Sequence, residues 1–227
     1  MHEIRTVIFD VGGVLLQYRW KYVLIDYGLS EEEAERVGHL MLNDPLWNEL
    51  DLGVRTQDKI ISDYLRKYKE DGKVMAWFLR HGEYMPVARP EIWDRVHELK
   101  KRGYGIYLLS NYSEDLFRKH TQYADFMNDI DGKVVSYAVH LVKPDRAIYE
   151  ELIRRYNLTR EDCIFFDDRE ENVAAAIECG IRAVRVTGRA MLAEALDKLL
   201  AGGACMNAGD VLCNCGIEKL TNCIMIR

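Results

Sequence analysis

Four short apolar runs in this chain end abruptly in polar residues, and helical segments separate them. The runs span residues 4–10, 104–109, 134–142 and 163–166. Their polar tips are Asp10, Ser110 with Asn111, Lys143, and Asp167 with Asp168. Because alternating strands and helices form right-handed βαβ units, the pattern predicts a Rossmann-like α/β fold, with a central parallel sheet in a three-layer sandwich. Parallel strands end at one edge of the sheet, where such folds bind ligands.

The segment between the first two runs lacks a strand pattern and carries helical signals instead. Ser30 precedes three glutamates, which is typical of a helix N-terminus, and Thr56 precedes a second helical stretch. We therefore expect an α-helical cap at residues 17–87, inserted into a catalytic core of residues 1–16 and 88–200. Residues 201–227 hold four cysteines, whose C-x7-C-x-C-x7-C spacing lacks the C-x2-C pairs of common zinc sites. We expect a disordered or loosely packed tail there.

Composition excludes several classes of partner. The chain has 227 residues, is 48% hydrophobic and carries a net charge of −6 without a basic face, which argues against nucleic-acid binding. Its apolar runs are too short to cross a bilayer, and Met1-His2-Glu3 begins no secretory signal. We expect a cytoplasmic protein. The sequence carries no signal for its oligomeric state.

The predicted sheet edge gathers acidic and cation-bearing side chains. Asp10, Asp167 and Asp168 would repel one another there unless a cation lies between them. Magnesium suits such a site, because carboxylates, water and a substrate phosphate satisfy it. Ser110, Lys143 and the backbone amides of the glycine turn are donors that suit a tetrahedral anion. The set predicts phosphoryl transfer through an aspartyl phosphate, with Mg²⁺ as cofactor.

The polar tips belong to four motifs that occur in a fixed order. They are Phe9-Asp10-Val11-Gly12-Gly13-Val14-Leu15, Leu108-Leu109-Ser110-Asn111, Val142-Lys143-Pro144 and Phe165-Phe166-Asp167-Asp168-Arg169-Glu170-Glu171-Asn172. Over about residues 4–200 the chain resembles the haloacid dehalogenase superfamily of aspartate-nucleophile phosphohydrolases, in the subgroup with a helical cap after the first strand. The second and fourth motifs are similar to those of bacterial α-D-glucose-1-phosphate phosphatases.

The resemblance implies a role for each motif residue. Asp10 would be the nucleophile and a metal ligand, and Gly12 would bind the metal through its carbonyl. Ser110 and the Asn111 amide would bind phosphoryl oxygens, and Lys143 would neutralise the nucleophile and the phosphate. Asp168, with Asp167 directly or through water, would complete the metal site. The reaction implied is hydrolysis of a small phosphorylated metabolite, with a sugar phosphate as the expected substrate.

One position departs from the superfamily pattern. Most of its phosphatases carry a second aspartate two positions after the nucleophile, as general acid and base, and this chain has Gly12 there. Three explanations remain open: a good leaving group such as an anomeric sugar oxygen, an acid from the cap or the substrate, or a poor enzyme. The glucose-1-phosphate phosphatases also have glycine here, so we expect an active enzyme. Within the cap, residues 47–55, including Asp51 and Gly53, are candidate specificity contacts.

Two other functions compete with phosphate hydrolysis. A 2-haloacid dehalogenase also uses an aspartate nucleophile, and its halide leaves without a proton, so Gly12 would be harmless. The Asp167-Asp168 pair argues against this, because it suits a metal and would repel a carboxylate substrate. The second alternative is a non-enzymatic protein that binds a phosphometabolite without turning it over.

Overall fold

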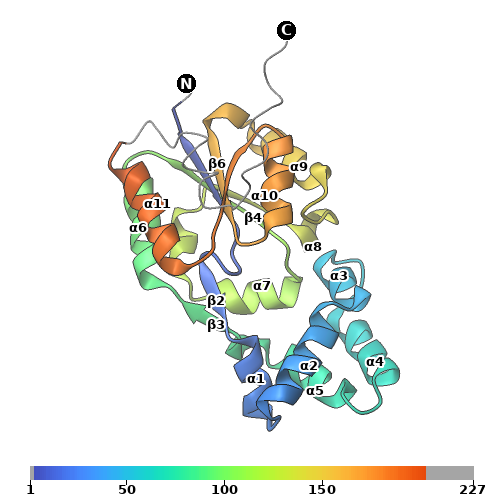
Figure 1. Ribbon diagram of the computed structural model, residues 1–227. Helices are drawn as coiled ribbons and strands as arrows, with labels where there is room; N and C mark the ends of the chain where they lie inside the picture. The colour runs from blue at the N-terminus through green and yellow to red at the C-terminus, as the bar shows by residue number, and fades with distance from the viewer. Residues whose placement is uncertain (1–2, 203–227) are drawn as a thin grey trace, which may run out of the picture.

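The protein, seen in a computed structural model that describes residues 3–202, is built on a parallel sheet with helices on both faces (Figure 1). The strand order is β5-β4-β1-β6-β7. The strands are β1 (Thr6–Phe9), β4 (Gly105–Ser110), β5 (Gly132–Val135), β6 (Cys163–Asp167) and β7 (Arg182–Arg185). This arrangement confirms the predicted α/β three-layer class.

The alternation of side chains along the central strands creates two apolar layers. Val7 and Phe9 belong to one buried cluster, whereas Ile8 belongs to the other, because successive residues of a strand point to opposite faces. The first cluster includes residues of α6 (Pro90–Lys101) and α11 (Arg189–Leu200), and the second includes residues of α9 (Arg146–Tyr156) and α10 (Glu170–Glu178). Helices therefore cover both faces of the sheet, and the ends of its strands form the edge that remains accessible to a ligand.

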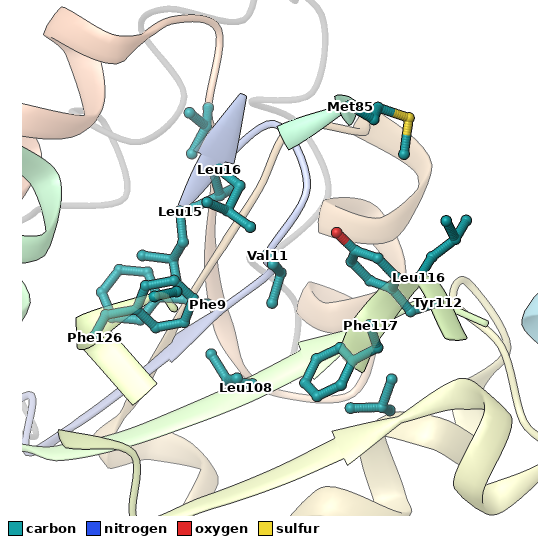
Figure 2. Packing of buried hydrophobic residues seen from close by; sticks show 14 of the residues in the cluster. Phe9, Val11, Leu15, Leu16, Met85, Leu108, Tyr112, Leu116, Phe117 and Phe126 are labelled. Atoms are coloured by element: carbon teal, nitrogen blue, oxygen red, sulfur yellow. The ribbon is translucent and has the colours of Figure 1, made fainter. Parts of the chain in front are cut away.

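The first cluster continues past the strand ends toward the inserted segment. Figure 2 shows Phe9 and Leu108 of the sheet, together with Tyr112 and Phe117 near α7 (Glu114–Thr121). The rings of Tyr112 and Phe117 lie 5.5 Å apart in an edge-to-face arrangement. This packing joins the sheet edge to the layer beneath the insertion.

The insertion lies between two short strands that form an antiparallel ribbon, β2 (Leu16–Tyr18) and β3 (Pro86–Ala88). It contains α1 (Trp20–Tyr27), α2 (Glu31–Leu42), α3 (Pro45–Asp51), α4 (Gln57–Lys67) and α5 (Gly72–Arg80), grouped at one end of the sheet (Figure 1). The predicted start of α2 is confirmed, because Ser30 and Glu33 form a reciprocal capping box. Within residues 3–202, no helix combines the length and apolar character needed to cross a membrane.

Short helical turns complete the described chain. They are η1 (Gly82–Tyr84), η2 (Asp125–Asp129), η3 (Arg160–Asp162) and α8 (Ser136–Val139).

The expectation that residues 134–142 are extended throughout is wrong. After β5 the chain turns into α8, which ends at His140 with a left-handed φ of 57°. The turn forms because Ser136 Oγ accepts from the Tyr112 N–H and donates to the Asp51 carbonyl, contacts that a straight strand would lose. The four tail cysteines lie outside the described residues, whereas Cys163 and Cys179 are buried free thiols.

Candidate active site

The structure brings the predicted tips of the central strands together. Phe9 is in register with Leu108 on one side and with Phe166 on the other, so the residues that follow these strands meet at one edge. Ser110 Oγ donates a short hydrogen bond to Asp10 Oδ1, and Lys143 Nζ lies 3.1 Å from the same oxygen. The predicted clustering of these groups is therefore present in the fold.

Lys143 occupies the centre of the site and is almost fully buried. Its ammonium donates to Asp167 Oδ2 at 2.6 Å and to the Leu109 carbonyl at 3.0 Å. The Asn111 side chain pairs with the Lys143 backbone, donating to its carbonyl at 2.9 Å and accepting from its N–H at 2.8 Å. Burial lowers the pKa of Lys143, but the carboxylates of Asp10 and Asp167 outweigh it and raise the pKa above its ordinary value. The lysine therefore stays charged.

Asp167 is the most enclosed carboxylate of the site, with no exposed surface. Besides Lys143, it accepts from the Arg169 N–H at 2.9 Å and from Asn172 Nδ2 at 3.0 and 3.1 Å. The sequence analysis gave Asn172 no role, although it is the last residue of the fourth motif and lies in the first turn of α10. These contacts suit Asp167 to hold Lys143 in place.

The carboxylates of the site fit a divalent cation. Ligand oxygens from Asp10, Asp167 and Asp168 lie within 4.8 Å of one another. Burial raises the pKa of Asp10 to about 7 despite the opposing charge of Lys143, and the neighbouring aspartates add to the rise. Burial and Asp167 likewise raise the pKa of Asp168. Oxygen ligands in this number suit Mg²⁺, which would relieve the repulsion.

Two glycines after β1 fit this crowded edge for different reasons. Gly13 has φ +69°, and a Cβ there would lie 2.4 Å from Asp168 Oδ2. A Cβ on Gly12 would lie 2.5 Å from the Tyr18 ring. The space that a side chain at position 12 would need is therefore filled by Tyr18, a residue of β2 that sequence reasoning did not single out.

A cavity of about 870 Å³ lies between this edge and the inserted helices. On the side of the core it is lined by Asp10, Gly12, Asn111, Lys143 and Asp168. On the opposite side it is lined by Tyr18 of β2 and by Trp20, Asp44, Trp47 and Asp51 of the insertion. Of the candidate specificity residues 47–55, Trp47, Asn48 and Asp51 line the cavity. Gly53 does not: its φ is +65°, and a Cβ there would lie 2.5 Å from the Tyr137 carbonyl oxygen.

The end of α3 is fastened to α8 of the core through backbone carbonyls. Ser136 Oγ donates to the Asp51 carbonyl at 2.6 Å. His140 Nδ1 lies 2.8 Å from the Leu52 carbonyl, which can only accept, so this nitrogen carries the hydrogen. These bonds involve only backbone carbonyls of the insertion, so they do not occupy the Asp51 carboxyl.

Known proteins resemble this chain in sequence and in fold. The chain is 25% identical over 185 residues to the sesquiterpene phosphatase astK of Aspergillus oryzae, covering 81% of this chain and 90% of that protein. Its fold is similar to that of a haloacid dehalogenase family enzyme from Bacteroides thetaiotaomicron, in complex with magnesium and inorganic phosphate, with TM-score 0.64, 21% identity and coverage of 82% and 96%. It is also similar to a dehalogenase solved as an intermediate complex, with TM-score 0.64, 19% identity and coverage of 83% and 88%.

The narrower resemblance to glucose-1-phosphate phosphatases stays a prediction. The family model of the haloacid dehalogenase-like hydrolases matches residues 4–180. This match covers most of the chain and contains all four motifs. The chain therefore belongs to the haloacid dehalogenase-like hydrolase family.

Proposed function

We propose that the protein is a magnesium-dependent phosphatase that hydrolyses a small phosphorylated metabolite through an aspartyl phosphate at Asp10. The observation that carries the proposal is the position of Lys143, whose ammonium lies between Asp10 and Asp167. A buried cation beside a nucleophilic carboxylate suits attack on a dianionic phosphoryl group. The curated relative named above is a phosphatase, which supports the same reaction class.

In this proposal Asp10 attacks phosphorus while Ser110, the Asn111 amide and Lys143 bind the phosphoryl oxygens. The contacts of Asp10 with the Val11 N–H, Ser110 and Lys143 all use Oδ1, so its second oxygen remains for another partner. Asp10, Asp168 and the Gly12 carbonyl would hold Mg²⁺, with Asp167 contributing through water. The ion would supply positive charge that offsets the charge developing on the phosphoryl oxygens.

The cavity supports a small substrate with both polar and apolar surface, and we propose a sugar phosphate. Its volume of about 870 Å³ is within the usual range for small-molecule sites. Trp20 and Trp47 offer aromatic surface, and Asn48 and Asp51 offer polar groups suited to sugar hydroxyls. The relative named for a sesquiterpene substrate makes an apolar organic phosphate the alternative to include.

A phosphate-release screen tests the proposal. Purified protein with Mg²⁺ is assayed against sugar phosphates, nucleotides, acyl phosphates and a sesquiterpenyl phosphate. We expect turnover of about 1 per second or more on at least one compound, lost in EDTA and in Asp10→Asn. Thermal unfolding of Asp10→Asn provides the control that the variant is folded.

Three outcomes would contradict the proposal. Full activity in Asp10→Asn would show that Asp10 is not the nucleophile. Halide release from 2-chloropropionate that persists in EDTA would favour a dehalogenase, which the similarity to a dehalogenase fold makes worth testing. Ligand-dependent stabilisation without phosphate release would favour a binding protein.

A further inference from the structure

Hydrolysis of a phosphate ester needs a proton for the leaving oxygen, and position 12 has no group to supply one. The Tyr18 ring occupies the space that a side chain at position 12 would take, but its hydrogen bonds prevent Tyr18 from acting as the acid. The Gly82 carbonyl can only accept, so His120 Nε2, 2.8 Å away, carries a hydrogen, and the neutral ring accepts from Tyr112 at Nδ1 at 2.8 Å. Tyr112 thus accepts from Tyr18, whose proton points along this chain of hydrogen bonds.

Two other ionisable groups that line the cavity, Asp44 and Lys143, are also committed to other contacts. Asp44 accepts from Lys67 Nζ at 2.5 Å and from the Leu46 N–H at 2.9 Å. Although burial opposes them, the hydrogen bonds from Lys67 and Tyr68 hold the pKa of Asp44 below its ordinary value, so it is ionised at neutral pH. Lys143 is bound between Asp10 and Asp167. None of these groups can deliver a proton without breaking the site.

We propose that Asp51, at the carboxyl end of α3, is the general acid and base that replaces the side chain missing at position 12. The proposal rests on the phosphatase function proposed above. Asp51 lines the same cavity as Asp10 but comes from the opposite wall, which is where a leaving group displaced from phosphorus would lie. The bonds from Ser136 and His140 hold the end of α3 against the core, so the position of the carboxyl is fixed from behind.

The electrostatic setting of Asp51 suits this role. Burial raises its pKa to about 7, and the charge of Asp10 adds to the rise. Hydrogen bonding from Trp47 and the Ser113 N–H, and the charge of Arg169, oppose the shift without cancelling it. A carboxyl with a pKa near neutrality can donate a proton in one step and accept one in the next.

The two steps balance as follows. An Asp10 oxygen bonds to phosphorus as the bond from phosphorus to the leaving oxygen breaks, and protonated Asp51 gives its proton to that oxygen. The alcohol departs. Asp51, now a carboxylate, takes a proton from water whose oxygen bonds to phosphorus, and the bond from Asp10 to phosphorus breaks. Inorganic phosphate leaves, Asp10 is a carboxylate again and Asp51 is protonated again.

Asp51→Asn tests the role because it preserves shape and removes the titratable proton. The probes are an alkyl phosphate, such as glycerol phosphate, and 4-nitrophenyl phosphate, whose leaving group needs no proton. We expect turnover of the alkyl phosphate to fall about 10²- to 10⁴-fold. With 4-nitrophenyl phosphate we expect a stoichiometric burst of nitrophenolate and then slow turnover, because water is no longer activated.

Glu49→Gln is the matched control. Glu49 lies on the same helix but, unlike Asp51, does not line the cavity. Its carboxylate pairs with Arg55 at 2.9 Å, and we expect both substrates to be turned over as in the wild type. An equal loss on both substrates without a burst would assign Asp51 a structural role, and unchanged turnover would assign it none; either result overturns the inference. If the wild type turns over neither probe nor any compound of the screen, the phosphatase proposal itself fails.

Discussion

The two walls of the cavity are built on different principles. The core edge, formed by Asp10, Ser110, Lys143 and Asp167, is a closed network in which each charged group is fixed by others. The cap wall is formed by Trp20, Trp47 and Asp51, all of which line the cavity. Hydrogen bonds to the backbone carbonyls of Asp51 and Leu52 join it to the core. The difference indicates a division of labour. The core edge suits a fixed electrostatic task, and the cap wall suits proton transfer and substrate selection.

The core edge should tolerate the loss of its cation poorly. We expect Lys143→Met to lower turnover by at least about 10²- to 10³-fold, because the phosphoryl group loses its buried cation. Stability should also fall by about 3–5 kcal/mol at pH 8, because two buried carboxylates lose their partner. Urea unfolding measures the second effect and phosphate release the first.

The loss of stability in Lys143→Met should depend on pH. Burial raises the pKa of Asp10 to about 7, so toward pH 5 this carboxyl binds a proton and needs the lysine less. Lys101→Met, at an exposed position of α6, is the control and should behave as the wild type. A loss of the same size at pH 5 and pH 8 would show that the role of Lys143 in stability is packing rather than charge.

The contact of Gly12 with Tyr18 gives a second test, because it joins the core edge to the ribbon beneath the cap. Gly12→Asp should destabilise the protein by about 1–3 kcal/mol, since the new side chain must displace the Tyr18 ring. In Gly12→Asp with Tyr18→Ala, the two losses should add up to more than the measured loss. A double-mutant cycle by urea unfolding measures this coupling, and additive losses would contradict it.

That cycle also bears on the proton donor. An aspartate at position 12 could take over proton transfer if it has space. Adding Gly12→Asp and Tyr18→Ala to Asp51→Asn should then restore part of the alkyl phosphate turnover that Asp51→Asn loses. Recovery by Gly12→Asp alone would mean that Tyr18 yields easily, and that its ring does not decide which wall carries the acid.

The core edge was predictable because local patterns encode it. An apolar strand that ends in Asp10 or Asp167 indicates its own place at the sheet edge, and the order of the motifs indicates that the tips meet. The cap wall left a weaker signal. Asp51 follows no strand, and its surroundings depend on α8. The sequence of residues 134–142 predicted an extended segment instead of this helix. Tyr18 fills the space beside Gly12 through a tertiary contact with no counterpart in local periodicity.

The smallest expected effect concerns the stability cost of Asp51. Its pKa in the folded state is about 7, above the ordinary value of 3.8 that applies when the chain is unfolded. A raised pKa in the folded state stabilises below about pH 4, and this contribution is lost as the pH rises to about 7. The ionised carboxyl is then buried near Asp10, with Arg169 as the opposing charge and the Tyr18 and Tyr112 hydroxyls close enough to sense it.

Asp51→Asn should therefore match the wild type at pH 4 and be more stable at pH 8. Because the cavity is open to solvent, we expect a gain of about 1–2 kcal/mol rather than the full value of the shift. Urea unfolding in EDTA, where no metal neutralises Asp10, measures it. A cap-wall group kept for function at a cost in stability should show this signature. A gain that is equal at both pH values would mean that the carboxyl of Asp51 is not held in an unfavourable charged state, and the contrast between the two walls would then rest on kinetics alone.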